Sequence, residues 1–151
     1  MPDILHKFIH TVHKYGLIKP GDRILLSLSA GKDSMAMLDL MMRFRQSMDF
    51  DVGIFHLNHL MRGDDSLLDE KLVREKSQSF GISAYIKCYD FKANTPKGLS
   101  FEEHARNIRY AMLADIAKSE GYNKIATAHN KTDNAETLLM RIFLGTGIYG
   151  L

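Results

Sequence analysis

The sequence predicts an α/β domain built on a parallel sheet of about four to five strands, with helices on both faces. Short apolar runs typical of buried strands alternate with longer segments in which apolar residues recur at helical spacing. After a first helix, the order strand then helix repeats four times with short connections. The chain has 151 residues, which is the usual size of one domain.

The composition is that of an ordinary globular protein. Hydrophobic residues make up 45% and charged residues 25%, which argues against disorder and against a fibrous repeat. The net charge is only +2, so charge alone does not indicate a nucleic-acid-binding protein. No stretch approaches the ~20 apolar residues of a membrane span. The single cysteine, Cys88, predicts a reducing, cytoplasmic compartment and is itself expected to be a buried structural thiol.

Five segments have the apolar spacing of helices. They are residues 3–15, 33–48, 66–80, 100–120 and 132–144. Ser66 and Ser100 each stand three positions before an acidic residue, the spacing of a capping box, so both are predicted to begin a helix. Gly81 and Gly121 are predicted to end the third and fourth of these helices.

Four short apolar runs predict the strands of the sheet. They cover residues 23–29, 51–58, 83–88 and 124–128. In such sheets ligands bind beyond the carboxyl ends of the strands, so the chemistry is expected near Ser29, Asn58, Cys88 and Ala128. Residues 89–99, which include Asn94-Thr95-Pro96, are predicted to form a mobile loop.

The segment that follows the first strand, Ser29-Ala30-Gly31-Lys32-Asp33-Ser34, has the composition of a phosphate-binding loop. Small residues let a backbone approach a ligand closely, and the helix that follows offers free N–H groups and a positive dipole end. An acid such as Asp33 beside phosphate requires a cation, for which Mg²⁺ is the best candidate. The same residues also suit a plain helix start with Ser29 or Asp33 as its cap, and this alternative stays open on these residues alone.

This loop resembles the SGGxDS pyrophosphate-binding loop of the N-type ATP pyrophosphatases, the PP-loop superfamily, with Ala30 in place of the first glycine. That change is harmless if the φ angle of Ala30 is negative. Members of this superfamily make adenylates from ATP and release pyrophosphate. The resemblance therefore implies that the loop binds the phosphates of ATP.

Four further segments are similar to motifs of the bacterial tRNA(Ile)-lysidine synthetases. They are residues 56–63, 103–110, 126–137 and 141–151, with Asn130 and Asn134 replacing a histidine and a glutamine of the third motif. The resemblance covers essentially the whole chain and implies an adenine nucleotide α-hydrolase-like, Rossmann-like fold. It also implies that residues 1–151 form the ATP-binding domain, without the tRNA-binding segments that follow it in that family.

The resemblance implies a ligase that forms a C–N bond. The wobble cytidine of tRNA(Ile) is adenylated at C2 with release of pyrophosphate, and free L-lysine then displaces AMP to give lysidine. ATP and Mg²⁺ are the implied cofactors, and tRNA(Ile) and lysine the implied partners, in the cytoplasm and without a membrane. Whether the protein forms a homodimer stays open.

The resemblance also implies roles for individual residues. The expected catalytic residues are Asp33, Asp133, Glu136 and Arg109. The expected ATP-binding residues are Ser29, Ala30, Gly31, Lys32, Asp33, Ser34, Phe55 and His56. The expected contacts to substrate or RNA are Asn58, His59, Arg62, Arg106, Arg109, His129 and Arg141. The expected Mg²⁺ ligands are Asp33 and Asp133.

Each of these roles has a plain structural alternative. Asp133 and Glu136 suit the first turn of any helix, where acidic side chains interact favourably with the helix dipole. Arg106 and Arg109 suit a solvated basic stripe. A zinc site from His56, His59 and His129 is a weaker reading of the histidines.

Two other functions remain as alternatives. A tRNA thiolase of the same superfamily suits Lys32, but such enzymes usually carry Cys-x-x-Cys pairs, which this chain lacks. A non-catalytic nucleotide-binding module would not need Asp33, Asp133 and Glu136 together.

Overall fold

The computed structural model describes residues 3–61 and 63–129, together with the backbone of residues 139–144. Its helices are α1 (Ile4–Tyr15), α2 (Lys32–Phe44), α3 (Asp64–Phe80), α4 (Phe91–Asn94) and α5 (Phe101–Glu120). Its strands are β1 (Arg23–Ser27), β2 (Asp51–Asn58), β3 (Ala84–Cys88), β4 (Lys124–His129) and β5 (Leu139–Leu144). The four predicted strands and the first four predicted helices are confirmed to within a few residues.

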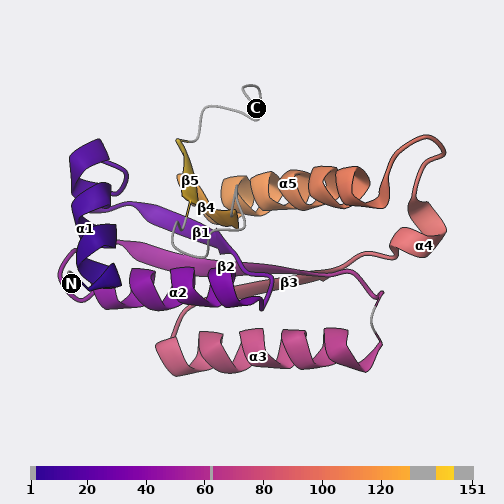
Figure 1. The fold of residues 1–151 in the computed structure, drawn as a ribbon, viewed down its shortest axis with the longest axis horizontal. Coiled ribbons are helices and arrows are strands. Elements are labelled where there is room, and N and C mark those ends of the chain that lie inside the picture. The colour runs from indigo at the N-terminus through magenta and orange to yellow at the C-terminus, as the bar shows by residue number, and fades with distance from the viewer. Residues whose placement is uncertain (1–2, 62, 130–138, 145–151) are drawn as a thin grey trace.

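The five strands form one sheet in the order β3-β2-β1-β4-β5. The first four are parallel, and β5 pairs antiparallel with β4. Helices α2 and α3 cover one face of the sheet and α5 covers the other (Figure 1). The predicted α/β class, with a parallel sheet between helices, is confirmed.

Alternation along the central strands builds a separate core on each face. Ile24 and Leu26 of β1 pack in the core beneath α2 and α3, whereas Leu25 between them packs in the core beneath α5. All three side chains are fully buried, as expected for a parallel strand covered on both faces. The apolar run of β1 therefore comes from its central place in the sheet.

Three of the four helix ends predicted from serine and glycine residues are confirmed. The N–H of Glu103 donates to Ser100 Oγ across 3.2 Å, which caps α5. Gly81 and Gly121 adopt left-handed conformations that end α3 and α5. The prediction for Ser66 is wrong, because α3 begins two residues earlier, at Asp64, and Ser66 is buried within its first turn. In the described part of the chain, no helix is long and apolar enough to cross a membrane.

Three other predictions need correction. Residues 139–144 were predicted to continue a helix but form strand β5, whose backbone pairs along β4 and covers an otherwise open edge. A short apolar run suits a helix or a strand equally, and only pairing decides between them. The predicted loop 89–99 contains the short helix α4, and Cys88 is exposed because β3 lies at the other edge of the sheet.

Candidate functional site

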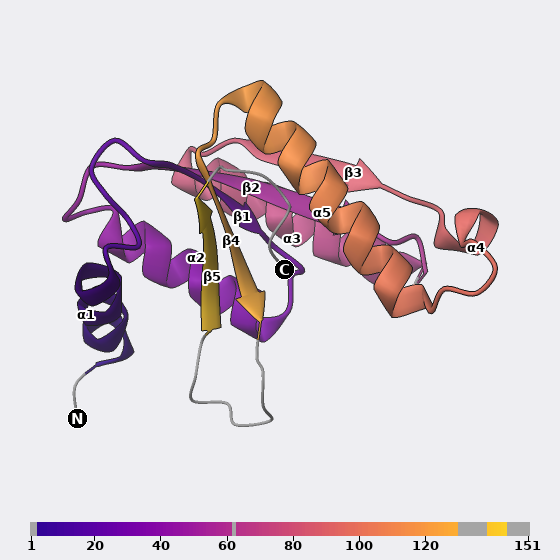
Figure 2. The same ribbon diagram turned by 90° about the horizontal axis from the view of Figure 1, so that it is seen from above.

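The candidate site lies where the strand order reverses. From β1 the chain moves outward to β2 and β3, and α5 then returns it to the opposite side of β1 as β4. In sheets of this kind, a crevice opens beyond the carboxyl ends of the two strands that flank the reversal, here β1 and β4. Figure 2 shows these two strands side by side, with α5 crossing the sheet above. The loop 28–31 leaves β1 at this point and leads into α2.

Hydrogen bonds within the loop hold it in one shape. The buried hydroxyl of Ser34 donates to the carbonyl of Gly31 across 3.0 Å and accepts from the N–H of Ser29 across 3.2 Å. The two serine hydroxyls lie 3.1 Å apart, and Ser29 Oγ also accepts from the N–H of Gly31. The predicted phosphate loop is thus organised by its own two serines.

Ala30 has a positive φ of 62°, so the condition under which alanine would be harmless at this position is not met. This is the left-handed region, in which a Cβ atom is unfavourable and glycine is the usual residue. The angle explains why the resembling motif has glycine here. Side chains in this region are uncommon, and such strain concentrates at functional loops.

The start of α2 offers an anion a favourable place. The N–H groups of its first turn, including those of Lys32 and Asp33, have no acceptor within the helix, and the dipole adds positive potential. The carboxylate of Asp33 is exposed and forms no hydrogen bond or ion pair with any residue that the structure describes. Asp33 is therefore available to a cation that accompanies phosphate.

The end of β2 supports the loop from beneath. His56 is buried, and its Nδ1 donates to the carbonyl of Leu28 across 2.7 Å. The N–H of Leu28 in turn donates to the carbonyl of Phe55, which extends the pairing of β1 and β2 by one residue. The Phe55 side chain is fully buried beneath α5. Contact of Phe55 and His56 with the adenine of ATP remains a prediction.

Asn58, the last residue of β2, is held by both ends of its amide. Its Nδ2 donates to Glu70 across 3.3 Å, and its Oδ1 accepts the N–H of Leu60. Glu70 also accepts two hydrogen bonds from Arg74, and these bonds together with that of Asn58 lower the pKa of the Glu70 carboxyl. Glu70 and Arg74 are not among the residues predicted from the sequence, although their four-residue spacing is that of a helical ion pair.

The three histidines near the strand ends do not converge. His56 is committed to Leu28, the ring of His59 packs 5.2 Å from that of Phe91, and His129 Nδ1 lies 2.9 Å from the hydroxyl of Thr127. Among the described residues, no group of three His, Cys, Asp or Glu side chains is placed to hold a metal ion. The zinc alternative therefore has no support in this part of the chain.

Arg109 and Arg106 differ in their surroundings. Arg109 lies four residues from both Ala105 and Leu113, which are buried on the sheet-facing side of α5. Burial lowers the pKa of the Arg109 guanidinium, and the nearby charge of Arg106 lowers it further. Arg109 has no ion pair with any described residue, whereas the exposed Arg106 packs 5.5 Å from the ring of Tyr110. A half-buried cation of this kind is well suited to an anionic ligand.

Several predicted site residues lie outside the described residues. They are Arg62, Asp133 and Glu136, and the side chain of Arg141 belongs with them. The described part of the predicted site therefore consists of the loop, Asp33, the strand ends and Arg109.

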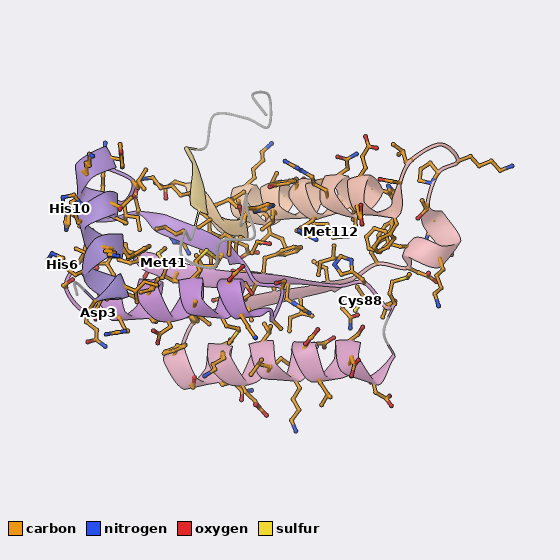
Figure 3. The ribbon with its side chains drawn as sticks, in the orientation of Figure 1. Asp3, His6, His10, Met41, Cys88 and Met112 are labelled. Carbon is orange, nitrogen blue, oxygen red and sulfur yellow. The ribbon has the colours of Figure 1, made fainter. Side chains whose placement is uncertain are left out.

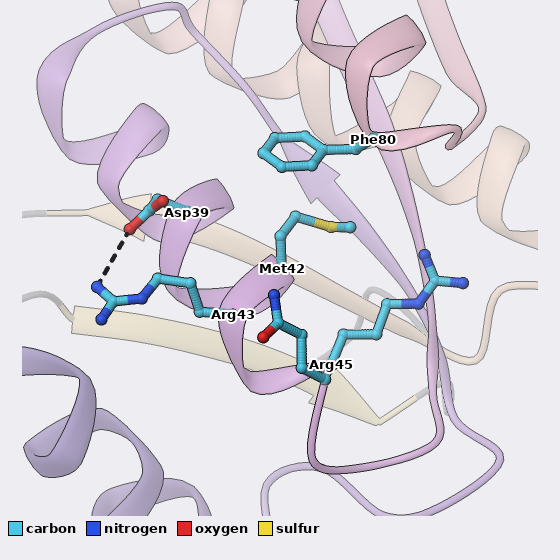
Figure 4. Close-up of a pocket in the computed structure, with 6 residues that line it drawn as sticks. Asp39, Met42, Arg43, Arg45 and Phe80 are labelled. Carbon is cyan, nitrogen blue, oxygen red and sulfur yellow. Dashed lines mark ion pairs between the residues drawn. The ribbon is translucent and has the colours of Figure 1, made fainter.

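A surface pocket of about 340 Å³ lies elsewhere on the molecule (Figure 4). It is lined by the last turns of α2 and by Phe80 at the end of α3. Both helices end at the amino edge of the parallel strands, opposite the loop. Arg43 in this pocket forms ion pairs with Asp39 and with Asp3. Asp3 directly precedes α1, and His6 and His10 of that helix lie at the same end of the molecule (Figure 3). The pocket is therefore separate from the candidate site.

The chain is similar to known proteins along nearly its whole length. It is 39% identical to tRNA(Ile)-lysidine synthase of Clostridioides difficile over an aligned length of 153 residues, gaps included, and this alignment covers 98% of the chain. It is 37% identical to that of Chlorobaculum tepidum and 39% identical to that of Thermosipho africanus, over 96% and 100% of the chain. The chain spans only 32%, 44% and 35% of the length of these three relatives.

A solved structure has a similar fold. It is the U34-tRNA thiolase NcsA from Methanococcus maripaludis with its [4Fe-4S] cluster, at a TM-score of 0.62 and 18% sequence identity. The match covers 82% of this chain and 45% of that protein, and at this identity it concerns the fold alone. A family model described as the PP-loop domain matches residues 3–151. With the loop at the carboxyl end of β1 and this match over nearly its full length, the chain belongs to the PP-loop domain family.

Proposed function

We propose that this chain is the ATP-using domain of a tRNA(Ile)-lysidine synthase. In this reaction the C2 carbonyl oxygen of a cytidine attacks the α-phosphorus of ATP, and the bond to pyrophosphate breaks. The amine of lysine then attacks C2, AMP leaves with that oxygen, and the amine gives up a proton. The tRNA, the lysine and the cytoplasmic location belong to this proposal.

The observation that carries the proposal is the loop Ser29–Ser34 at the carboxyl end of β1, beside the point of strand reversal. Its serines organise the backbone and α2 presents free N–H groups there, an arrangement suited to pyrophosphate. The curated relatives, which share 37–39% identity with this chain over nearly its whole length, carry the name of this reaction.

Individual residues have distinct tasks in this proposal. The amides from Ala30 to Ser34 bind pyrophosphate and orient ATP for in-line attack. Arg109 stabilises negative charge that develops on the phosphate, because a partly desolvated guanidinium acts more strongly than one in water. One of the acids Asp33, Asp133 and Glu136 accepts the proton that lysine must lose.

Mg²⁺ fits the residues that the structure describes. Mg²⁺ is usually held by one or two carboxylates together with the phosphates of the substrate. The exposed Asp33, beside the loop and without an ion pair among the described residues, meets that requirement. Mg²⁺ would supply neutralisation of phosphate charge here, and Asp133 is proposed as its second carboxylate.

A thiolase is the second candidate, because the solved structure of similar fold is one. That protein contains a [4Fe-4S] cluster, and such clusters are held by several cysteines. The present 151 residues contain one cysteine, Cys88, so they do not provide the ligands for such a cluster. We therefore favour lysine over sulfur as the incoming group.

The test measures release of pyrophosphate from ATP by the chain, with and without tRNA(Ile) and lysine. We expect release to require tRNA and labelled lysine to enter the tRNA. Asp33→Asn should lower the rate by about a hundredfold, the scale of one lost charge-stabilising group. Asp39→Asn is the matched control, because Asp39 is an exposed acid on the same helix that pairs with Arg43; it should leave the rate unchanged.

Two results would contradict this proposal. Pyrophosphate release without incorporation of lysine would assign the second step to another nucleophile. Equal rates in Asp33→Asn and the wild-type chain would remove Asp33 from the site.

A further inference from the structure

Exposed apolar side chains gather beside the carboxyl edge of the sheet. Nine large hydrophobic residues are exposed in the described part of the chain, and six of them belong to residues 60–68 and 99–101. The first of these segments follows β2, and the second precedes and opens α5. Contiguous exposed apolar surface on a protein marks an interaction site.

An aromatic cluster joins these two segments. Phe91 of α4 is almost fully buried, and its ring lies 5.2 Å from that of His59 and 5.3 Å from that of Phe101. The rings of His59 and Phe101 also contact each other, at 6.2 Å. The rings of Tyr89 and His104 also contact that of Phe91, and a hydrogen bond of 3.3 Å links these two residues to each other. The cluster therefore brings together the segments that follow β2 and β3 and the start of α5.

Phe101 is fixed by this cluster and yet remains open to solvent. Its two ring contacts, to His59 and Phe91, are both edge-type, with interplanar angles of 64° and 76°. About two fifths of the residue (41%) stays exposed. A ring that is held by its neighbours and partly open to solvent loses little freedom when a flat ligand binds it.

The neighbouring loop is also held in an unusual conformation. Leu60 has a positive φ of 53°, and its N–H is bound by Asn58, whose amide is held in turn by Glu70. Leu60 and Met61 are 48% and 40% exposed. Leu60 thus combines a left-handed conformation with an exposed position. Strained backbone of this kind clusters at functional sites.

We propose that the exposed ring of Phe101, held in place by His59 and Phe91, is a platform on which an unpaired base of the RNA substrate stacks, with Leu60 and Met61 as its apolar rim. This inference rests on the proposed function, because it requires an RNA beside the phosphate loop. Single-stranded RNA is recognised chiefly by stacking of splayed-out bases on aromatic side chains. His59 follows β2, which lies next to β1 in the sheet, so the cluster is at the same carboxyl edge as the phosphate loop.

The test uses the wild-type chain and an RNA stem–loop with the sequence of the tRNA(Ile) anticodon arm. 2-Aminopurine is placed at each loop position in turn, because its fluorescence is quenched when it stacks on an aromatic ring. We expect quenching at one or more positions in the wild-type chain and in Phe101→Trp. Phe101→Leu keeps an apolar side chain but has no aromatic face, so quenching should disappear and RNA affinity should fall about fivefold or more.

Phe80→Leu is the matched control, because Phe80 is an exposed phenylalanine (36%) at the far end of α3. It should leave quenching and affinity unchanged. Equal quenching in Phe101→Leu and the wild-type chain would overturn the platform, as would the absence of RNA binding by the wild-type chain. Binding of ATP with Mg²⁺ should be equal in all four proteins, which verifies that they fold. Quenching that depends on Phe101 without any pyrophosphate release would instead contradict the proposed function and leave the platform standing.

Discussion

Asp22 and Lys124 form a buried ion pair, with 2.5 Å between Oδ2 and Nζ. Asp22 immediately precedes β1, and Lys124 is the first residue of β4. Lys124 also donates to the carbonyl of Leu17, and Asp22 accepts from Asn123 and from the N–H of Lys19. The pair thus ties together, at the amino edge, the two strands whose opposite ends flank the candidate site.

We expect Lys124→Met to destabilise the chain by about 3–5 kcal/mol, because the Asp22 carboxylate would remain buried without its counter-charge. Urea denaturation followed by circular dichroism measures this change. Lys71→Met is the control, since Lys71 is largely exposed and its ion pair with Glu75 contributes about 0–1 kcal/mol. Equal stability of the two variants would mean that water replaces the ion pair at no cost.

The same pair predicts how stability depends on pH. Burial by itself raises the pKa of Asp22, but the hydrogen bond from Lys124, together with those from Lys19 and Asn123, holds it below its ordinary value. A carboxyl with a lowered pKa stabilises the folded state above the pKa of the unfolded chain, about 4, and this stability is lost as the pH falls through the folded pKa. Unfolding free energy should therefore decrease below about pH 4.

Asp22→Asn tests that assignment. The variant should be less stable at neutral pH and should lose less of its stability between about pH 5 and pH 3. The slope that remains belongs to other carboxyls with a lowered pKa, among them Glu70. An unchanged slope in Asp22→Asn would show that Asp22 does not titrate differently in the folded and unfolded chains.

Ala30→Gly should stabilise the chain, because glycine adopts a φ of 62° without the penalty of a Cβ atom. We expect a gain of about 1 kcal/mol, which raises the melting temperature of a domain of this size by about 2–4 °C. Ala111→Gly is the control with the opposite sign: Ala111 is an exposed residue inside α5, where glycine costs about 1 kcal/mol. A lower melting temperature for Ala30→Gly would contradict the left-handed geometry of the loop.

Gly53→Ala should destabilise the chain, because a Cβ atom at this position would collide with the hydroxyl and ring of Tyr122. Both residues are buried, so the Tyr122 ring has to move within a packed core, at a cost of about 1–3 kcal/mol. The double variant with Tyr122→Leu removes the ring and should lose less stability than the sum of the two single variants. Strict additivity would show that the two positions do not touch.

The predicted phosphate loop illustrates how far the sequence alone reaches. Its residues lie between an apolar run and a helical pattern, and both of these are local signals, so the loop and its place at a strand end were predictable. The φ angle of Ala30 was not predictable, because alanine by itself favours negative angles and the positive one arises only in the folded loop.

Other features of the site depend on partners distant in sequence. His56 donates to Leu28, 28 residues away, and no periodicity indicates such a contact. The apolar run of β5 suits two kinds of element, and pairing with the open edge of β4 selects the strand. Whether Asp33 acts together with Asp133 and Glu136 remains a prediction, because the last two lie outside the described residues.

The sequence by itself determined the order of the four parallel strands and of the four long helices α1, α2, α3 and α5, the α/β class and the chemical character of the segment after β1. These depend on apolar spacing, glycine and capping residues, all of which act within a few residues. The tertiary structure alone decided that Asp22 meets Lys124, that Phe91 gathers His59 and Phe101 into one cluster, and that β5 completes the sheet. The reason is that these arrangements depend on which strands pair and which faces are buried, and a local pattern does not encode the distance between segments.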